Sequence, residues 1–191
     1  MVTELHPLVE AAGQTGALPD WAVCRPGRRA HAARVADLLS GWATDLGLGE
    51  SEIVRWKAAG HLHDALKDAP VPDLVSLADS GWPDPLLHAP ACAARLREDG
   101  VTDEELLLAI TYHSTGHPEF GLLGEFLYMA DFLDPGRRFL ASEREELRGR
   151  LPTDRDAVLL EILRLRITRL LDHRTLVLPD SLSLWNRVVA T

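Results

Sequence analysis

Apolar residues recur every three to four positions along almost the whole chain after residue 30, and this spacing limits what the chain can fold into. It places the apolar side chains on one face of an α-helix. One such stripe consists of His31, Val35, Leu38, Leu39 and Trp42. The alternation typical of β-strands is nearly absent, with residues 175–178 as the one candidate. The pattern predicts an all-α fold, a single helical bundle over residues 1–191.

Capping residues, prolines and glycines divide this pattern into separate helices. Ser51 is expected to cap a helix that continues to Lys67. Thr102 and Glu105 have the spacing of a capping box, and Pro90 suits the first turn of another helix. Further helices are expected over residues 121–132, 143–150, from 153 or 154 to 171, and over 181–189.

The composition excludes several classes of protein. The 191 residues include 20 Lys and Arg against 29 Asp and Glu, a formal net charge of −9, which disfavours a face for duplex nucleic acid. No apolar run approaches the ~20 residues that cross a bilayer, and the acidic start Met1–His6 lacks the features of a signal peptide. Two cysteines, Cys24 and Cys92, are too few for a disulfide framework. We therefore expect a cytoplasmic protein that binds neither nucleic acid nor a membrane.

Some polar residues fall on the apolar faces of the expected helices. They are His31, His63, Asp64, His113 and Asp131. A single inward histidine is ordinarily a hydrogen-bonded core residue. Burying an unpaired carboxylate costs several kcal/mol, however, so inward acids normally find a partner or a metal. Because imidazole and carboxylate together suit iron, manganese or zinc, the group favours a metal site in the helical core.

Five segments, in order along the chain, carry a resemblance to a known family. They are residues 28–35 (RRAHAARV), 60–67 (GHLHDALK), 86–90 (LLHAP), 109–116 (AITYHSTG) and 128–137 (YMADFLDPGR). The chain resembles the YqeK family, the HD-type symmetrical bis(5′-nucleosyl)-tetraphosphatases of bacteria, within the all-α HD-domain phosphohydrolases. The resemblance covers residues 28–137, and residues 138–191 are far less diagnostic. Three positions depart from the family pattern: Ala89 stands where glycine is usual, Asp134 where glutamate is usual, and Phe120 at or near a position that is often methionine.

The resemblance implies a pair of divalent metal ions in a single HD domain. The first ion would be held by His31, His63, Asp64 and Asp131, and the second by His88 and His113, with Asp64 bridging the two. Such a pair lowers the pKa of a bridging water and clamps a phosphoryl oxygen. The metals of the family are reported as iron, which this ligand set permits without dictating it, and manganese would also suit it.

The activity implied by the resemblance is symmetrical hydrolysis of dinucleoside tetraphosphates, in which diadenosine tetraphosphate and water give two ADP. A metal-bound hydroxide would attack a phosphorus atom of the bridging chain, and Asp64 and Lys67 are the expected catalytic residues. The substrate would be bound by Arg28, Lys67, Thr115, His117 and Arg137.

Three of these residues also have a purely structural interpretation. Lys67 can be an ion-paired lysine near a helix end, Thr115 can simply end its helix, and His117 can belong to a surface loop. Besides the nucleotide, the partner considered is a second copy of the chain in a homodimer.

Three other functions fit the same residues less well. An HD-type nucleotidase with one metal, acting on another nucleotide, would have no use for His88 and His113 as ligands. A non-catalytic nucleotide-sensing module would be expected to lack ligands, whereas none is missing here. A di-iron oxygenase of the HD type would leave Lys67 and the block ending at Arg137 unexplained.

Overall fold

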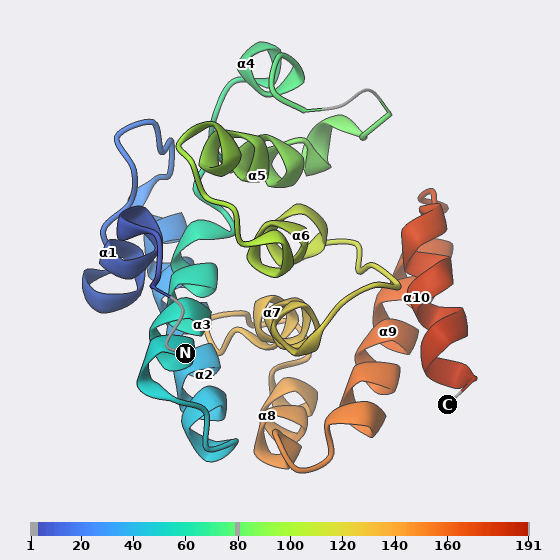
Figure 1. Cartoon of the computed structure of the whole chain (residues 1–191). Coiled ribbons are helices and arrows are strands. Elements are labelled where there is room, and N and C mark those ends of the chain that lie inside the picture. Colours follow the sequence, from blue (N-terminus) through green and yellow to red (C-terminus); the bar gives the residue numbers. More distant parts are fainter. Residues whose placement is uncertain (1–3, 79–80, 191) are drawn as a thin grey trace.

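The computed structural model describes residues 4–78 and 81–190 (Figure 1). The helices are α1 (Pro7–Thr15), α2 (Pro26–Asp45), α3 (Glu50–Leu62), α4 (Val71–Val75), α5 (His88–Glu98), α6 (Glu104–Tyr112), α7 (Leu122–Leu133), α8 (Ala141–Arg150), α9 (Arg155–Asp172) and α10 (Pro179–Val189), with a short 3-10 helix at Asp84–Leu86. These described residues contain no β-strand, so the predicted all-α fold is confirmed. Residues 175–178 form part of the connection between α9 and α10.

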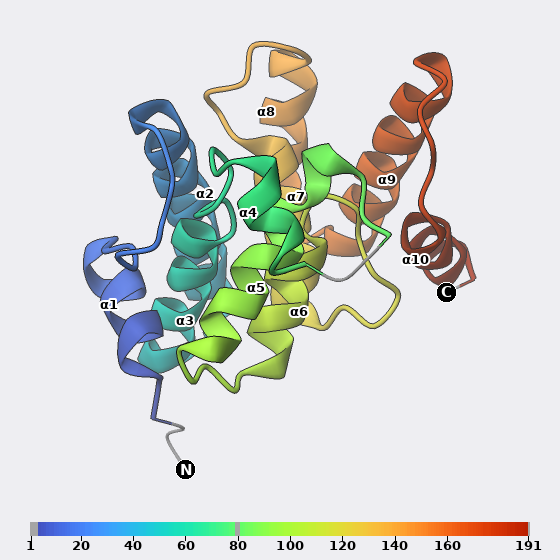
Figure 2. The same ribbon diagram turned by 90° about the horizontal axis from the view of Figure 1, so that it is seen from above.

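The helices pack in three groups that follow the order of the chain. At one side α1 packs on α3, and α3 packs on α2. In the middle α5, α6 and α7 lie one after another, and α2 also contacts α7, which joins the first two groups. At the opposite side α9 contacts α7 and α10 packs on α9, as both views show (Figure 1, Figure 2).

Helix α7 runs through the interior of this arrangement. Its residues from Leu123 to Leu133 are all buried. The ring of Phe126 lies 5.7 Å from that of Trp42 on α2 and 5.1 Å from that of Trp56 on α3, measured between centroids. An acidic side chain on this helix, such as Asp131, is therefore enclosed by the molecule.

Helices α2 and α3 approach closely at a glycine. A Cβ atom on Gly60 would lie 2.4 Å from the Cα atom of Ala36, a distance at which two carbon atoms cannot pack. Gly60 therefore lets the end of α3 lie directly against α2. This approach brings His63, just after α3, beside His31 on α2.

Helix α3 ends five residues earlier than predicted. The expectation that it continues to Lys67 is wrong, because residues 63–67 form hydrogen-bonded turns after the helix ends at Leu62. The segment before α2 intervenes here: the N–H of Val23 donates to the carbonyl of Ala65 at 2.9 Å, and the N–H of Asp68 donates to the carbonyl of Val23 at 3.1 Å. Contacts between distant segments thus replace the last helical turn.

Two predicted helix starts also differ. Helix α3 is preceded by Gly49 instead of the expected cap Ser51. At α6, Asp103 is the cap in place of Thr102, because its carboxylate accepts the N–H of Leu106 at 3.0 Å. Glu105 instead accepts hydrogen bonds from Arg55 on α3 and from the N–H of Leu123.

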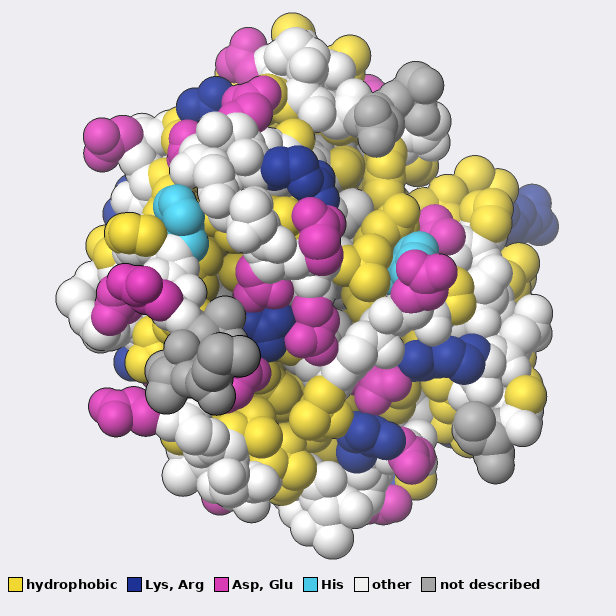
Figure 3. Space-filling view, in the orientation of Figure 1, with side chains coloured by type: hydrophobic (Ala, Val, Ile, Leu, Met, Phe, Trp, Pro, Cys, Tyr) yellow, Lys and Arg dark blue, Asp and Glu magenta, His cyan; other side chains and the backbone are white. Residues whose placement is uncertain are grey.

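Charged side chains of both signs are dispersed over one face of the molecule. On the face seen in Figure 3, lysine and arginine alternate with aspartate and glutamate, and no broad basic area gathers there. In the part of the chain that the structure describes, no helix is long and apolar enough to span a membrane.

Candidate metal centre

Four histidine side chains surround the carboxylate of Asp64. The Nε2 atoms of His31 and His63 lie 3.9 and 3.7 Å from Oδ2 of Asp64. The Nε2 atoms of His88 and His113 lie 3.2 and 3.5 Å from Oδ1 of the same carboxylate. Each oxygen of Asp64 therefore faces its own pair of imidazoles.

The five residues come from the ends of four segments that are far apart in the sequence. His31 lies in the second turn of α2, and His63 and Asp64 follow the end of α3. His88 is the first residue of α5, and His113 follows the last residue of α6. All five side chains are buried. The resemblance grouped the same five residues around two ions.

The hydrogen bonds of three rings set which nitrogen faces Asp64. The Nδ1 atoms of His63 and His113 each donate to a backbone carbonyl, of Gly60 and of Ile110, at 2.8 Å. Nδ1 of His31 donates to the carboxylate of Asp134 at 2.7 Å. With Nδ1 protonated, the lone pair of the neutral ring sits on Nε2, which faces Asp64. Metal-binding histidines in proteins are oriented in this way.

Burial keeps two of these imidazoles neutral. Removal from water lowers the pKa of His63 to about 3 and that of His88 to about 4. Burial would lower the pKa of His31 as well, but its hydrogen bonds to Asp131 and Asp134 more than offset this effect and raise the pKa to about 9. In the metal-free centre at neutral pH, His31 therefore carries a second ring proton and a positive charge. His63 and His88 are neutral and can bind a cation.

The two inward carboxylates are ionised. Burial alone would raise the pKa of Asp64, but the surrounding imidazoles of His63, His113 and His88 hold it well below its usual range. For Asp131, burial is outweighed by the hydrogen bond with His31 and by the charges of Arg137 and Arg166, which together lower its pKa. Both carboxylates thus carry the negative charge that a divalent cation needs.

The donor atoms form two groups that share one member. The donor atoms of His31, His63 and Asp64 lie within 4.8 Å of one another, and so do those of Asp64, His88 and His113. Imidazoles with a shared, ionised carboxylate suit divalent transition metals, so the residues present fit the cations that the HD pattern implies. The structure thus supports divalent-metal binding at this cluster.

Asp131 lies beside the first group. Its Oδ1 is 3.2 Å from Nε2 of His31. The same carboxylate accepts a hydrogen bond from Arg137 on Oδ1 at 2.6 Å and one from Arg166 on Oδ2 at 3.0 Å. Asp131 is therefore close enough to join His31 around a cation and is already held by two arginines.

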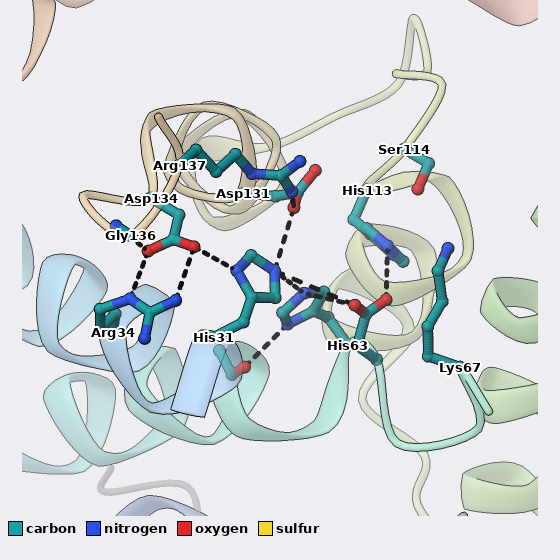
Figure 4. Close-up of polar contacts among 12 residues, drawn as sticks. His31, Arg34, His63, Lys67, His113, Ser114, Asp131, Asp134, Gly136 and Arg137 are labelled. Atoms are coloured by element: carbon teal, nitrogen blue, oxygen red, sulfur yellow. Dashed lines mark hydrogen bonds and ion pairs between the residues drawn. The ribbon is translucent and has the colours of Figure 1, made fainter. Parts of the chain in front are cut away.

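Asp134 orients His31 from the side opposite the cluster (Figure 4). Besides the bond from His31, its carboxylate accepts two hydrogen bonds from Arg34, at 2.6 and 3.0 Å, and one from the N–H of Gly136 at 2.9 Å. Sequence reasoning noted Asp134 only as a departure from the family pattern and missed this role. The signal in the sequence is weak, an acid directly before a Pro-Gly turn.

Lys67 lies at the other end of the cluster. Its Nζ is 3.1 Å from Nε2 of His88, and burial lowers its pKa. The charges of two nearby carboxylates oppose this effect, and those of Arg28 and Arg137 add to it. Lys67, one of the predicted phosphate-binding cations, therefore lies beside His88 of the second group of donors.

Thr115 and His117 lie in the turn and loop that follow α6. The hydroxyl of Thr115 is buried, and its closest acceptors are the carbonyls of Tyr112 and Gly116 at 3.5 and 3.4 Å. The ring of His117 lies 4.3 Å from that of Tyr112 and its Nε2 is 3.9 Å from Asp180 on α10. Both residues follow His113 closely in sequence, but their described contacts are to Tyr112 at the end of α6, to this loop and to α10.

Arg166 on α9 is a site residue that sequence reasoning missed. Besides Asp131, its guanidinium donates to the carbonyls of Ser114 and Tyr128, at 2.8 and 3.3 Å. The segment 138–191 therefore reaches the cluster. A signal was available, because Arg166 falls three and four positions after the buried residues Leu163 and Ile162, on the inward stripe of its helix.

A large cavity lies away from the cluster. Its volume is about 1110 Å³, and residues lining it include Val9 of α1, Glu50 and Arg55 of α3, and Asp103 before α6. It lies at the beginning of α3, whereas the histidine cluster lies beyond the end of that helix. The chemistry of the donor atoms, and not cavity size, locates the candidate site.

Comparison with known proteins agrees with the geometry. Residues 28–136, which include every histidine and carboxylate of the cluster, match the HD domain. The chain belongs to the HD domain family. A crystal structure described as a predicted HD superfamily hydrolase involved in NAD metabolism, from Clostridium acetobutylicum, is similar to this chain with a TM-score of 0.76 and 25% identity. The alignment covers 95% of this chain and 94% of that one.

Curated relatives share the HD segment. A protein named symmetrical bis(5′-nucleosyl)-tetraphosphatase from Halalkalibacterium halodurans is 36% identical over 107 residues, which are 56% of each chain. A protein of the same name from Bacillus subtilis is 35% identical over 106 residues, which are 55% of this chain and 56% of that one. The chain thus spans about half the length of the curated relatives it matches.

Proposed function

We propose that this chain is a metal-dependent hydrolase that cleaves dinucleoside tetraphosphates symmetrically, so that diadenosine tetraphosphate and water give two ADP. The observation that carries the proposal is the carboxylate of Asp64 shared between two groups of imidazoles. A centre with two cations and a bridging ligand is the arrangement used for hydrolysis of phosphate esters and anhydrides. The names of the curated relatives support the choice of substrate.

The proposed metal ligands are the residues that the resemblance assigned. The residues that would hold the first cation are His31, His63, Asp64 and Asp131, and those for the second are Asp64, His88 and His113. The cations are proposed to be iron, with manganese as the alternative, since imidazole with carboxylate suits both. When bound, such a pair activates water and stabilises the charge that develops on the phosphate oxygens.

The cationic side chains of the protein bind the substrate in this proposal. A tetraphosphate carries several negative charges to a protein of net charge −9, so local cations must outweigh the global field. Lys67 contacts His88 and Arg137 contacts Asp131, and with Arg28 as a third cation they are proposed to bind the phosphates that are not attacked. Thr115 and His117 are retained as proposed contacts of the substrate, placed in the loop after His113.

The test is a product assay on diadenosine tetraphosphate with anaerobically purified protein, with the metal content measured on the same sample. ADP as the sole product, about two iron or manganese ions per chain and loss of turnover on chelation would support the proposal. AMP and ATP as products would contradict symmetrical cleavage. Two bound cations with uncut substrate would favour an HD hydrolase acting on another nucleotide.

A further inference from the structure

Two arginines from different parts of the chain share the carboxylate of Asp131. Arg137, in the turn after α7, donates to Oδ1, and Arg166, on α9, donates to Oδ2. Oδ1 is also the oxygen that lies 3.2 Å from His31. Both guanidinium groups compensate the same negative charge, but they do so through different oxygens of the carboxylate and in different surroundings.

Arg166 is fixed by several contacts. Two of its nitrogens donate to the carbonyls of Ser114 and Tyr128, and the guanidinium lies over the rings of Tyr128 and Phe132, at 4.3 and 5.4 Å from their centroids. Its side chain is 17% exposed. A planar guanidinium held at this many points loses little further freedom when it orients a carboxylate.

Arg137 is in a more open position. Its side chain is 41% exposed. It donates to Oδ1 of Asp131, the oxygen that also faces His31, so it lies beside the first group of donors. An exposed guanidinium can exchange one anionic partner for another more easily than a buried one.

Arg166 also joins the two halves of the centre. Asp131 stands beside the first group of donors, whereas the carbonyl of Ser114 follows His113 of the second group. One guanidinium therefore bonds to a residue beside the first group and to the residue that follows the second.

We propose that the two arginines divide their roles, with Arg166 as a positioning residue that fixes Asp131 and the segment after His113 for metal binding, and Arg137 as the residue that leaves Asp131 to bind a phosphate. The part that concerns Arg137 rests on the proposed function. The part that concerns Arg166 is independent of the substrate, because it predicts a property of the metal site alone.

The experiment compares Arg166→Gln, Arg137→Gln and the control Arg164→Gln, a substitution at an exposed position of the same helix. The dissociation constant for Mn²⁺ is measured by calorimetry on metal-free protein, and kcat and KM are measured for diadenosine tetraphosphate. Arg166→Gln is expected to raise the Mn²⁺ dissociation constant about tenfold or more, as for other partners of metal ligands. Arg137→Gln is expected to bind Mn²⁺ like the wild type and to raise KM, and Arg164→Gln to change neither.

A second variant guards against loss of folding. Arg166→Lys keeps the positive charge and can reach either Asp131 or a carbonyl, but not all three acceptors, so it is expected to fold and to bind Mn²⁺ less tightly than the wild type. The division of roles would be overturned if the Arg166 variants that fold bind Mn²⁺ with the affinity of the wild type. It would also be overturned if Arg137→Gln weakens Mn²⁺ binding as much as Arg166→Gln does. If the wild type binds Mn²⁺ but does not cleave the substrate, the proposed function fails while the Mn²⁺ measurements still decide the role of Arg166.

Discussion

At the scale of single residues, the centre depends on hydrogen bonds that orient its ligands. His31 illustrates this, because it is held between Asp134 on Nδ1 and the carboxylates of Asp131 and Asp64 on the side of Nε2. The sequence placed His31 on an inward face and the resemblance assigned it to a metal. The partner Asp134 could not be predicted, because it lies 103 positions away and the contact exists only once α2 and α7 have packed.

Replacing Asp134 tests this orientation. Asp134→Asn keeps the shape of the side chain and removes the charge, so the pKa of His31 in the metal-free protein is expected to fall below its value of about 9. Mn²⁺ affinity is expected to fall about tenfold. NMR titration of the histidine ring and calorimetry measure the two effects. Asp45→Asn, at the exposed end of α2, is the control, and an unchanged pKa of His31 in Asp134→Asn would refute this account.

The raised pKa of His31 also predicts a pH dependence. Because its pKa is about 9 in the metal-free protein, His31 is protonated near neutral pH and must lose that proton before Nε2 can bind a cation. Binding of Mn²⁺ is therefore expected to release a proton, and affinity is expected to fall as the pH is lowered from 9 toward 7. The protonated ring stabilises the metal-free fold below about pH 6.5, and that contribution is lost as the pH rises through 9. Calorimetry in two buffers of different ionisation enthalpy counts the protons, and no release near pH 7.5 would contradict the assignment.

Substitutions of Asp64 and of Lys67 are expected to have different effects on metal binding and turnover. Asp64→Ala removes the carboxylate that both groups of imidazoles share, so it should abolish metal binding and turnover together. Lys67→Ala should retain the metal and lose rate, because the amino group is proposed to act on the phosphate. Metal content and single-turnover rates on the same samples separate the two variants. A metal-free Lys67→Ala protein would disprove this separation of roles.

At the scale of helices, the order and type of the elements were predictable but several of their ends were not. Periodic apolar spacing identifies a helix without reference to its neighbours. The end of α3 depends on the segment before α2, which takes the carbonyl of Ala65, and the start of α6 depends on which of two adjacent polar residues reaches Leu106. The early end of α3 matters to function, because it leaves Asp64 in the turns after the helix, where four imidazoles surround its carboxylate.

The contact between α2 and α3 at Gly60 can be tested directly. A methyl group there would meet Ala36, so Gly60→Ala is expected to force the helices apart, to destabilise the fold by about 1–3 kcal/mol and to weaken Mn²⁺ binding by separating His63 from His31. Gly41→Ala, where nothing lies within 4 Å of the added methyl, is the matched control and should be neutral or stabilising by up to about 1 kcal/mol. Urea unfolding of both variants supplies the comparison. Equal stabilities would show that the close approach is not required.

At the scale of the whole molecule, the cations are expected to contribute to stability. They bind the folded protein alone, because the donors come from segments that only folding brings together. Mn²⁺ at one hundred times its dissociation constant should stabilise the fold by about 2.7 kcal/mol, which for a chain of this size raises Tm by about 5–10 °C. Thermal unfolding with and without chelator measures the shift. Asp64→Ala should show no shift, and a shift of equal size in that variant would indicate binding elsewhere.

The same scale shows where sequence reasoning ended. The residues that the resemblance assigned as ligands could be identified from the sequence, because each lies in a short segment with a recognisable pattern of its own. In the structure these residues lie together. The role of Arg166 was missed, since it depends on how α9 docks against α7, 35 positions away at Asp131. Net charge disfavoured a broad basic face, but it could not indicate that Lys67 lies beside His88 and Arg137 beside Asp131.

The reach of α9 into the centre has a consequence for how the protein is made. The four imidazoles and Asp64 are all translated by residue 113, whereas Asp131 and Arg166 follow later. At translation speeds of roughly 5–20 residues per second, the 53 residues from 113 to 166 (166 − 113) take about 3–10 s. For those seconds the nascent chain carries most of the donors but lacks the guanidinium that bonds to Asp131 and to the carbonyl of Ser114. The complete centre can therefore form only after residue 166 has been translated.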